Sequence, residues 1–204
     1  MISRTALTLG VALNLPAAIT AQNAYIAPGD NLVVEGIPPI PAALRSEVDR
    51  YTHTRAAELL SWHPIRREML IATFFADVPQ IHRVRFPGGA RTQLTFFDDR
   101  PTSGVSYQPT TGNYFIFRRD RGGDQNYQIY RYDLANDSIT LLTDGASRNS
   151  PGIWSHAGDR IAYSSTRRNG KDTDLYVVEP LRPQADRMFA QLEGGGWSVL
   201  DWSP

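Results

Sequence analysis

The chain has 204 residues, a formal net charge of zero and no cysteine. Zero net charge provides no overall field that would draw the protein to nucleic acid or to an anionic membrane. The lack of cysteine excludes disulfide bonds, thiol catalysis and cysteine-ligated metals. With 16 glycines, 14 prolines and 10% aromatic residues, the composition favours a turn-rich, all-β fold.

Residues 1–21 have the layout of a secretory signal peptide. A single positive charge at Arg4 precedes an apolar run that ends in small residues at Ala21. Asn14 and Pro16 interrupt this run, so a membrane-spanning helix is the weaker interpretation. We predict cleavage after Ala21, export to the periplasm or the outside of the cell, and no membrane span in the mature chain.

An N-terminal arm, residues 22–55, is expected next. The proline-rich stretch 37–41 must be extended, because proline fixes its own φ and lacks an N–H donor. Residues 42–55 predict a short helix that leads into a strand over 56–62.

A repeat begins at residue 56. Its first landmark is an aromatic residue, called here the leading aromatic, at Trp62, Tyr107, Trp154 and Trp202. The spacings are 45, 47 and 48 residues (62 to 107, 107 to 154 and 154 to 202). Seven residues after each of the first three, an apolar run begins at Met69, Tyr114 and Ile161.

Two further landmarks keep the same period. Strand-like runs occur at 80–84, 128–132 and 174–178, and Gln93-Leu94-Thr95 and Leu141-Leu142-Thr143 close the first two units. Four short strands in slightly more than forty residues are typical of a β-propeller blade. We predict an incomplete propeller over 56–204, with blades at about 56–98, 103–145 and 150–193 and the first strand of another at 197–204.

The connections within each unit have turn chemistry. Glycine with asparagine or aspartate occurs at 110–113 and 157–160, where a tight connection needs positive φ, and Asn169-Gly170 is the strongest short turn signal. The leading aromatics are predicted to pack within or between blades rather than to stack on a ligand.

Four segments carry a resemblance to a known repeat. Leu-Thr-Asp-Gly (142–145), Ser-Pro-Gly-Ile-Trp-Ser (150–155), Gly-Asp-Arg-Ile-Ala-Tyr-Ser-Ser (158–165) and Asp-Leu-Tyr-Val-Val (174–178) resemble the propeller repeat of two groups. One group is the TolB-type periplasmic proteins. The other is the N-terminal domains of exported prolyl oligopeptidase-family serine peptidases. The resemblance covers residues 59–204.

Three other segments, 36–44, 61–64 and 88–97, are similar to the peptidase group, whose members include dipeptidyl aminopeptidases and acylaminoacyl peptidases. This resemblance implies a propeller that covers an α/β-hydrolase domain and admits only oligopeptides to it. The catalytic Ser, Asp and His would lie in that later domain. The alternative is a non-enzymatic TolB-type propeller that recognises protein partners, and a structural propeller without an assigned partner is a third reading.

Candidate catalytic residues are few. Ser106, in Gly-Val-Ser-Tyr-Gln-Pro (104–109), lacks the second glycine of a nucleophile elbow and runs into a proline instead of a helix. The four histidines (His53, His63, His82 and His156) are scattered, and none has the i, i+4 partner of a helical metal pair. We predict structural roles for all of them, with His63 and His156 in tight turns.

Candidate ligand sites are equally weak. Asp172 and Asp174, beside Asn169, lack the dense oxygen spacing of a calcium loop. The glycine runs 122–123 and 194–196 are not followed by the Gly-Lys-Ser/Thr of a phosphate loop. We therefore predict no catalytic residue, no cofactor and no metal in this chain.

The number of units is small for a propeller, which usually closes with four to eight blades. We therefore expect the sequence to be the N-terminal piece of a longer protein, without peptidase activity of its own. The alternative is that several copies assemble to close one ring.

Overall fold

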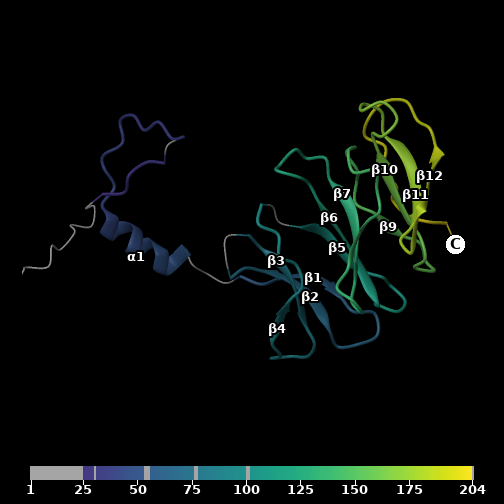
Figure 1. Cartoon of the computed structure of the whole chain (residues 1–204), viewed down its shortest axis with the longest axis horizontal. Helices are drawn as coiled ribbons and strands as arrows, with labels where there is room; N and C mark the ends of the chain where they lie inside the picture. Colours follow the sequence, from purple (N-terminus) through teal and green to yellow (C-terminus); the bar gives the residue numbers. More distant parts are fainter. Residues whose placement is uncertain (1–24, 30, 53–55, 76–77, 100–101, 204) are drawn as a thin grey trace, which may run out of the picture. The chain divides into compact units, whose positions relative to one another are not determined.

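The structure, a computed structural model, describes residues 25–29, 31–52, 56–75, 78–99 and 102–203. The predicted signal peptide and His53 lie outside the described residues. The chain divides into two compact units, Met1–Thr54 and Arg55–Pro204 (Figure 1).

The described residues of the first unit include the helix α1 (Ala42–Thr52), where a short helix was predicted. Pro41 precedes it directly, a position that suits a residue without an N–H donor. The proline-rich stretch folds back on the start of the described chain, because Tyr25 and Pro41 form an antiparallel bridge and the Ile26 N–H donates to the Ile40 carbonyl at 2.9 Å. None of the helix residues is buried.

The second unit consists of three four-stranded antiparallel sheets, drawn from blue-teal to yellow in Figure 1. Blade 1 contains β1 (Glu58–Trp62), β2 (Met69–Thr73), β3 (Gln80–Val84) and β4 (Arg91–Gln93). Blade 2 contains β5 (Ser103–Tyr107), β6 (Tyr114–Arg119), β7 (Gln128–Asp133) and β8 (Ile139–Leu141). Blade 3 contains β9 (Ile153–Trp154), β10 (Ile161–Ser165), β11 (Asp174–Glu179) and β12 (Arg182–Ala190).

In each sheet the strands follow one another in chain order, as in a propeller blade. The predicted fold class, a partial β-propeller with nearly all-β structure, is confirmed.

Cross-strand pairing identifies three equivalent side chains in every blade, called here the leading triplet. The triplets are Trp62–Met69–Val84, Tyr107–Phe115–Tyr132 and Trp154–Ile161–Val178. In blade 2 the partner of the leading aromatic is Phe115, one residue later than the seven-residue spacing predicted. The reason is the longer β5–β6 turn, in which Gln108 Oε1 accepts the N–H groups of Thr110, Thr111 and Gly112.

The hydrophobic cores lie between neighbouring blades. In the first core, side chains of blade 1 pack on the leading triplet of blade 2 (Leu70, Ile81 and Leu94 against Tyr107, Phe115 and Tyr132). In the second core, side chains of blade 2 pack on blade 3 (Ile116, Ile129 and Leu142 against Ile161, Tyr163, Tyr176 and Val178). Each blade therefore contributes one face to each neighbour.

The Leu-Thr landmark lies just beyond the fourth strand and not within it, because β4 ends at Gln93 and β8 ends at Leu141. Thr95 Oγ1 accepts the Ile81 N–H at 2.9 Å and donates to Gln80 Oε1 at 2.9 Å. Thr143 makes the same two bonds to Ile129 and Gln128. The threonine hydroxyl accepts the third-strand N–H that a backbone carbonyl of the fourth strand would otherwise accept. The fourth strand therefore ends before the threonine.

Blade 3 departs from this pattern. Asp174 stands where blades 1 and 2 have a buried glutamine, and it accepts the Leu192 N–H at 2.9 Å and the Arg168 Nε–H at 2.8 Å. Its fourth strand, β12, has nine residues, whereas β4 and β8 have three each. The pairing of β11 with β12 shifts register twice.

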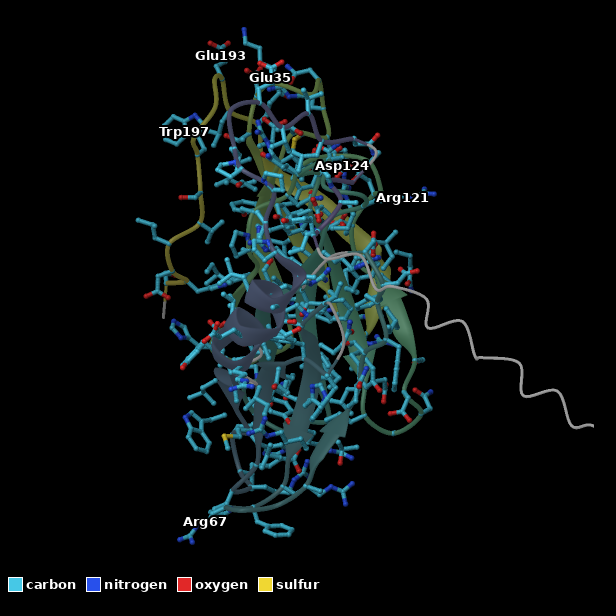
Figure 2. All side chains as sticks on the ribbon, turned by 90° about the vertical axis from the view of Figure 1, so that its left-hand side faces the viewer. Glu35, Arg67, Arg121, Asp124, Glu193 and Trp197 are labelled. Atoms are coloured by element: carbon cyan, nitrogen blue, oxygen red, sulfur yellow. The ribbon has the colours of Figure 1, made fainter. Side chains whose placement is uncertain are left out.

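Residues 197–203, expected to open another blade, form no strand. Trp202 nevertheless reaches blade 3, since its Nε1–H donates to the Ile153 carbonyl at 3.1 Å. Trp197, on the same segment, points away from the sheets in Figure 2.

Gln128→Ala should lower the free energy of unfolding by about 2–3 kcal/mol, because Thr143 and the Gly145 N–H lose their buried acceptor. Urea denaturation measures the change. Gln184→Ala on the exposed edge strand β12 is the control and should change it by less than about 0.5 kcal/mol. Equal effects of the two substitutions would contradict the role assigned to Gln128.

Candidate functional site

The contact between blades 1 and 2 contains a buried hydrogen-bonded pair. The Tyr107 hydroxyl donates to Glu68 Oε1 at 2.8 Å, and only 4% of Glu68 is exposed. Burial opposes ionisation of Glu68, but the hydrogen bonds from Tyr107 and Arg66 outweigh it and hold the pKa of Glu68 below its ordinary value. Burial and the same carboxylate raise the pKa of Tyr107. The pair therefore joins two blades and offers no free base.

Ser106 belongs to the contact between blades 2 and 3. Its Oγ accepts the Trp154 Nε1–H at 3.1 Å and donates to the Tyr107 carbonyl at 3.2 Å. A nucleophilic serine needs a neighbouring base to take its proton, and the hydrogen-bond partners of Ser106 are an indole and a backbone carbonyl. The structure gives this serine a structural partner in the next blade.

His63 holds the β1–β2 turn. Its Nδ1 accepts the N–H groups of Ile65 at 3.1 Å and Arg66 at 3.0 Å, so the ring proton is on Nε2. Gly112, in the β5–β6 turn of blade 2, has φ 65°, and a Cβ atom on it would come within 2.4 Å of His63 Nε2. The two blades therefore make this close contact through a glycine. Burial, aided by Arg66, lowers the pKa of His63.

The other described histidines lie apart from it. His82 is fully buried in β3, with Nδ1 3.0 Å from the Gln80 carbonyl, and its Nε2 has no hydrogen-bond partner among the described residues. His156 is exposed, and its Nε2 lies 3.0 Å from the Trp202 carbonyl. The fold does not bring His63, His82 and His156 together in one site.

The two aspartates considered above as weak candidates for calcium ligands are bound by other groups of the protein. Arg168 contacts both Asp172 and Asp174, and Asn169 donates to Asp172 at 2.8 Å. The hydrogen bond from Asn169 is the main cause that lowers the pKa of Asp172. The hydrogen bond from Arg168 is the main cause that lowers the pKa of Asp174. In the part of the chain that the structure describes, no three histidine or acidic side chains are grouped to hold a metal.

The glycine runs lie in loops. Residues 122–123 lie in the β6–β7 loop, near the labelled Arg121 and Asp124 in Figure 2. Residues 194–196 follow β12, and the Gly194 N–H donates to Asp172 at 3.0 Å. Among the described segments, no helix is long and apolar enough to cross a membrane.

A cavity of about 600 Å³ lies between blades 2 and 3. Its walls are three turn regions, contributed by residues 108–114, residues 157–159 and residues 179–182, together with Asp133. The lining offers hydroxyl, amide and carboxylate groups, and Glu179 accepts the Arg182 Nε–H at 2.7 Å. Its lining contains no serine or histidine.

Sequence reasoning did not find this cavity. The turns that form it belong to different repeats, and each turn by itself has only the pattern of an ordinary blade connection. The period shows which turns occupy equivalent positions in different blades. This equivalence is the signal from which the shared cavity could have been inferred.

Comparison with known proteins supports the fold. No protein-family model matches the chain, and no curated protein matches it. It is similar to the crystal structure of TolB from Acinetobacter baumannii, with 27% identity and a TM-score of 0.51 over 67% of this chain and 32% of that one.

It is also similar to the structure of a putative TolB from Agrobacterium tumefaciens, with 20% identity and a TM-score of 0.52 over 76% of this chain and 53% of that one. The chain has a TolB-like propeller fold. It spans about a third and about half the length of these two proteins.

His63→Gln should flatten the dependence of stability on pH between pH 7 and pH 5. Because the pKa of His63 is lowered in the fold, the unfolded chain takes up its proton first, near pH 6.5. The stabilising contribution is complete above that pH and is lost as the pH falls toward the lowered pKa. Glutamine, present at the equivalent Gln108, keeps the turn acceptor without titrating.

Urea midpoints across this range give the measurement for His63→Gln. An unchanged slope in His63→Gln would show that His63 does not contribute to it.

Ser106→Ala and Trp154→Phe should be non-additive, because both remove the same inter-blade hydrogen bond. Unfolding free energies of the two single variants and the double variant should give a coupling of about 1 kcal/mol. Additive losses would mean that the bond contributes nothing to joining the blades.

Proposed function

We propose that this chain is the propeller portion of an exported serine peptidase of the prolyl oligopeptidase family. In this proposal it gates the access of oligopeptides to an α/β-hydrolase domain encoded outside residues 1–204. The observation that carries it is the similarity of segments 36–44, 61–64 and 88–97 to the peptidase group, within a TolB-like propeller fold.

The local structure agrees with a role in recognition. Ser106, His63 and Glu68, which could otherwise serve chemistry, all make bonds that hold turns or join blades. The cavity between blades 2 and 3 offers hydrogen-bonding groups that suit a polypeptide. The chain would then select substrates, and the cleavage would need residues of another domain.

A second candidate is a non-enzymatic TolB-type propeller that binds protein partners. It is favoured by the similarity to the two TolB structures, at 27% and 20% identity. The same cavity would then contact a partner protein. Both candidates are exported in this proposal, because residues 1–21 have the layout of a signal peptide.

The chain alone should not hydrolyse oligopeptides, and Ser106→Ala should behave identically to the original in a fluorogenic peptide assay.

The deciding experiment is to read the coding DNA that follows the Pro204 codon. Further blades followed by a GxSxG strand–turn–helix would support the peptidase. Further blades followed by a stop would support the TolB-type protein, and hydrolysis abolished by Ser106→Ala would overturn both.

A further inference from the structure

A second cavity, of about 540 Å³, lies between blades 1 and 2, and two opposite charges in its wall do not meet. The lining includes Arg83 of β3 and Asp137 of the β7–β8 turn. Asp137 Oδ1 accepts the hydroxyl of the buried Tyr132 at 2.9 Å. Among the described residues, the Arg83 guanidinium makes no hydrogen bond and no ion pair, and its Nε is buried without a partner.

Arg131 occupies the equivalent position in the next contact between blades. Arg83 pairs with Thr92 of the fourth strand in blade 1. Arg131 pairs with Thr140 of the fourth strand in blade 2. The Arg131 guanidinium donates to the Pro180 carbonyl of blade 3 and to Thr140 Oγ1. The repeat therefore uses this arginine position to bind a backbone carbonyl that faces it.

The turns that face the two arginines differ in length. Blade 3 connects β11 to β12 through residues 180–181 only, and this short turn brings the Pro180 carbonyl to Arg131. Blade 2 connects β7 to β8 through residues 134–138. In the part of the chain that the structure describes, no carbonyl of this longer turn accepts an N–H from Arg83. Arg83 therefore keeps free N–H donors in the wall of the cavity.

The two charges limit what the cavity can bind. Arg83 disfavours a cation and Asp137 disfavours an anion, because each would bring a like charge close in a partly buried site. A neutral group that carries both an acceptor and a donor can satisfy both side chains. An amide is such a group, and the Arg131 contact provides an example of a peptide carbonyl bound at the equivalent position.

The same wall contains exposed apolar side chains. Phe96 is 76% exposed and Ile139 is 44% exposed, and both line the cavity. Phe97 beside them is held by Phe117, with ring centroids 5.9 Å apart, and by the Arg119 guanidinium, 4.3 Å from its ring centroid. An apolar ligand group next to the amide would remove these exposed side chains from water.

We propose that this cavity binds a peptide. A backbone carbonyl of the peptide accepts from the Arg83 guanidinium, and the N–H that follows it donates to the Asp137 carboxylate. The next side chain of the peptide is apolar and lies against Phe96 and Ile139. This inference does not rest on the proposed function, which uses the cavity between blades 2 and 3.

The probe for this site is the capped peptide acetyl-Ala-Pro-Leu-Ala-amide. It has no charge, and it carries the Pro-Leu pair that Arg131 meets at residues 180–181. The peptide is titrated into the 204-residue chain, and the NMR signals of the backbone amides are followed. Binding should shift the signals of residues 92–97 and 137–139. The signals of residues 157–159, in the other cavity, should stay unchanged.

Arg83→Met and Arg131→Met are a matched pair, because each keeps a long unbranched side chain and removes the guanidinium. Arg83→Met should weaken binding of the probe at least about tenfold, since the hydrogen bond to a charged donor is lost. It should change the unfolding equilibrium constant, measured in urea, by less than about threefold, because the guanidinium has no partner to lose.

Arg131→Met should have the opposite effects. It should raise the unfolding equilibrium constant at least about fivefold, because the bonds to Pro180 and Thr140 are lost. Binding of the probe should be unchanged, since Arg131 does not line the cavity.

Three results would overturn the proposal. One is a titration that does not shift the signals of residues 92–97 and 137–139. Another is equal binding of the probe by the original chain and by Arg83→Met. The third is a larger shift of the same signals by inorganic phosphate than by the peptide at equal concentration, which would assign the cavity to an anion.

Discussion

Each blade has apolar side chains on both faces, and every other feature of the second unit depends on this constraint. In β6 the neighbouring residues Phe115 and Ile116 point to opposite sides, so one joins the core shared with blade 1 and the other the core shared with blade 3. All residues of β10 are buried as well. A single four-stranded sheet of this composition could not keep both faces from water, and the stacking of blades follows.

The polar side chains inside the unit serve that stacking. Gln80 and Gln128 tie the third strand of their blade to the segment after the fourth strand, with a threonine hydroxyl between them. Ser61 and Ser106 accept N–H groups from the next blade. A buried polar group without a partner lowers the stability of the fold, so these side chains have structural roles. They include residue types from which a catalytic centre would have been built.

The period of the landmarks was sufficient to predict the three blades and their strand order, because a repeat must place equivalent residues in equivalent positions. Of the leading aromatics predicted to pack within or between blades, Tyr107 and Trp154 belong to the cores, whereas Trp62 is 62% exposed. Three details depended on side-chain geometry that a period does not contain. The β5–β6 turn holds one extra residue because Gln108 can accept three successive N–H groups. The fourth strands end before Thr95 and Thr143 because those hydroxyls replace backbone acceptors. The cavity between blades 2 and 3 arises only when turns from separate repeats meet.

In this chain the leading triplets, the aliphatic side chains packed on them and the glutamine–threonine ties all hold the blades together. The recognition proposed for this chain would use the turns that line the cavity between blades 2 and 3, at residues 108–114, 157–159 and 179–182. Blade 3 shows that the glutamine–threonine ties can be replaced, because its long β12 and the Arg168–Asp174 pair stand in their place without disturbing the core that it shares with blade 2. Substitutions of core side chains in the sheets and at turn-holding residues such as His63 thus test the fold, and substitutions of turn residues that line the cavity test the proposed recognition.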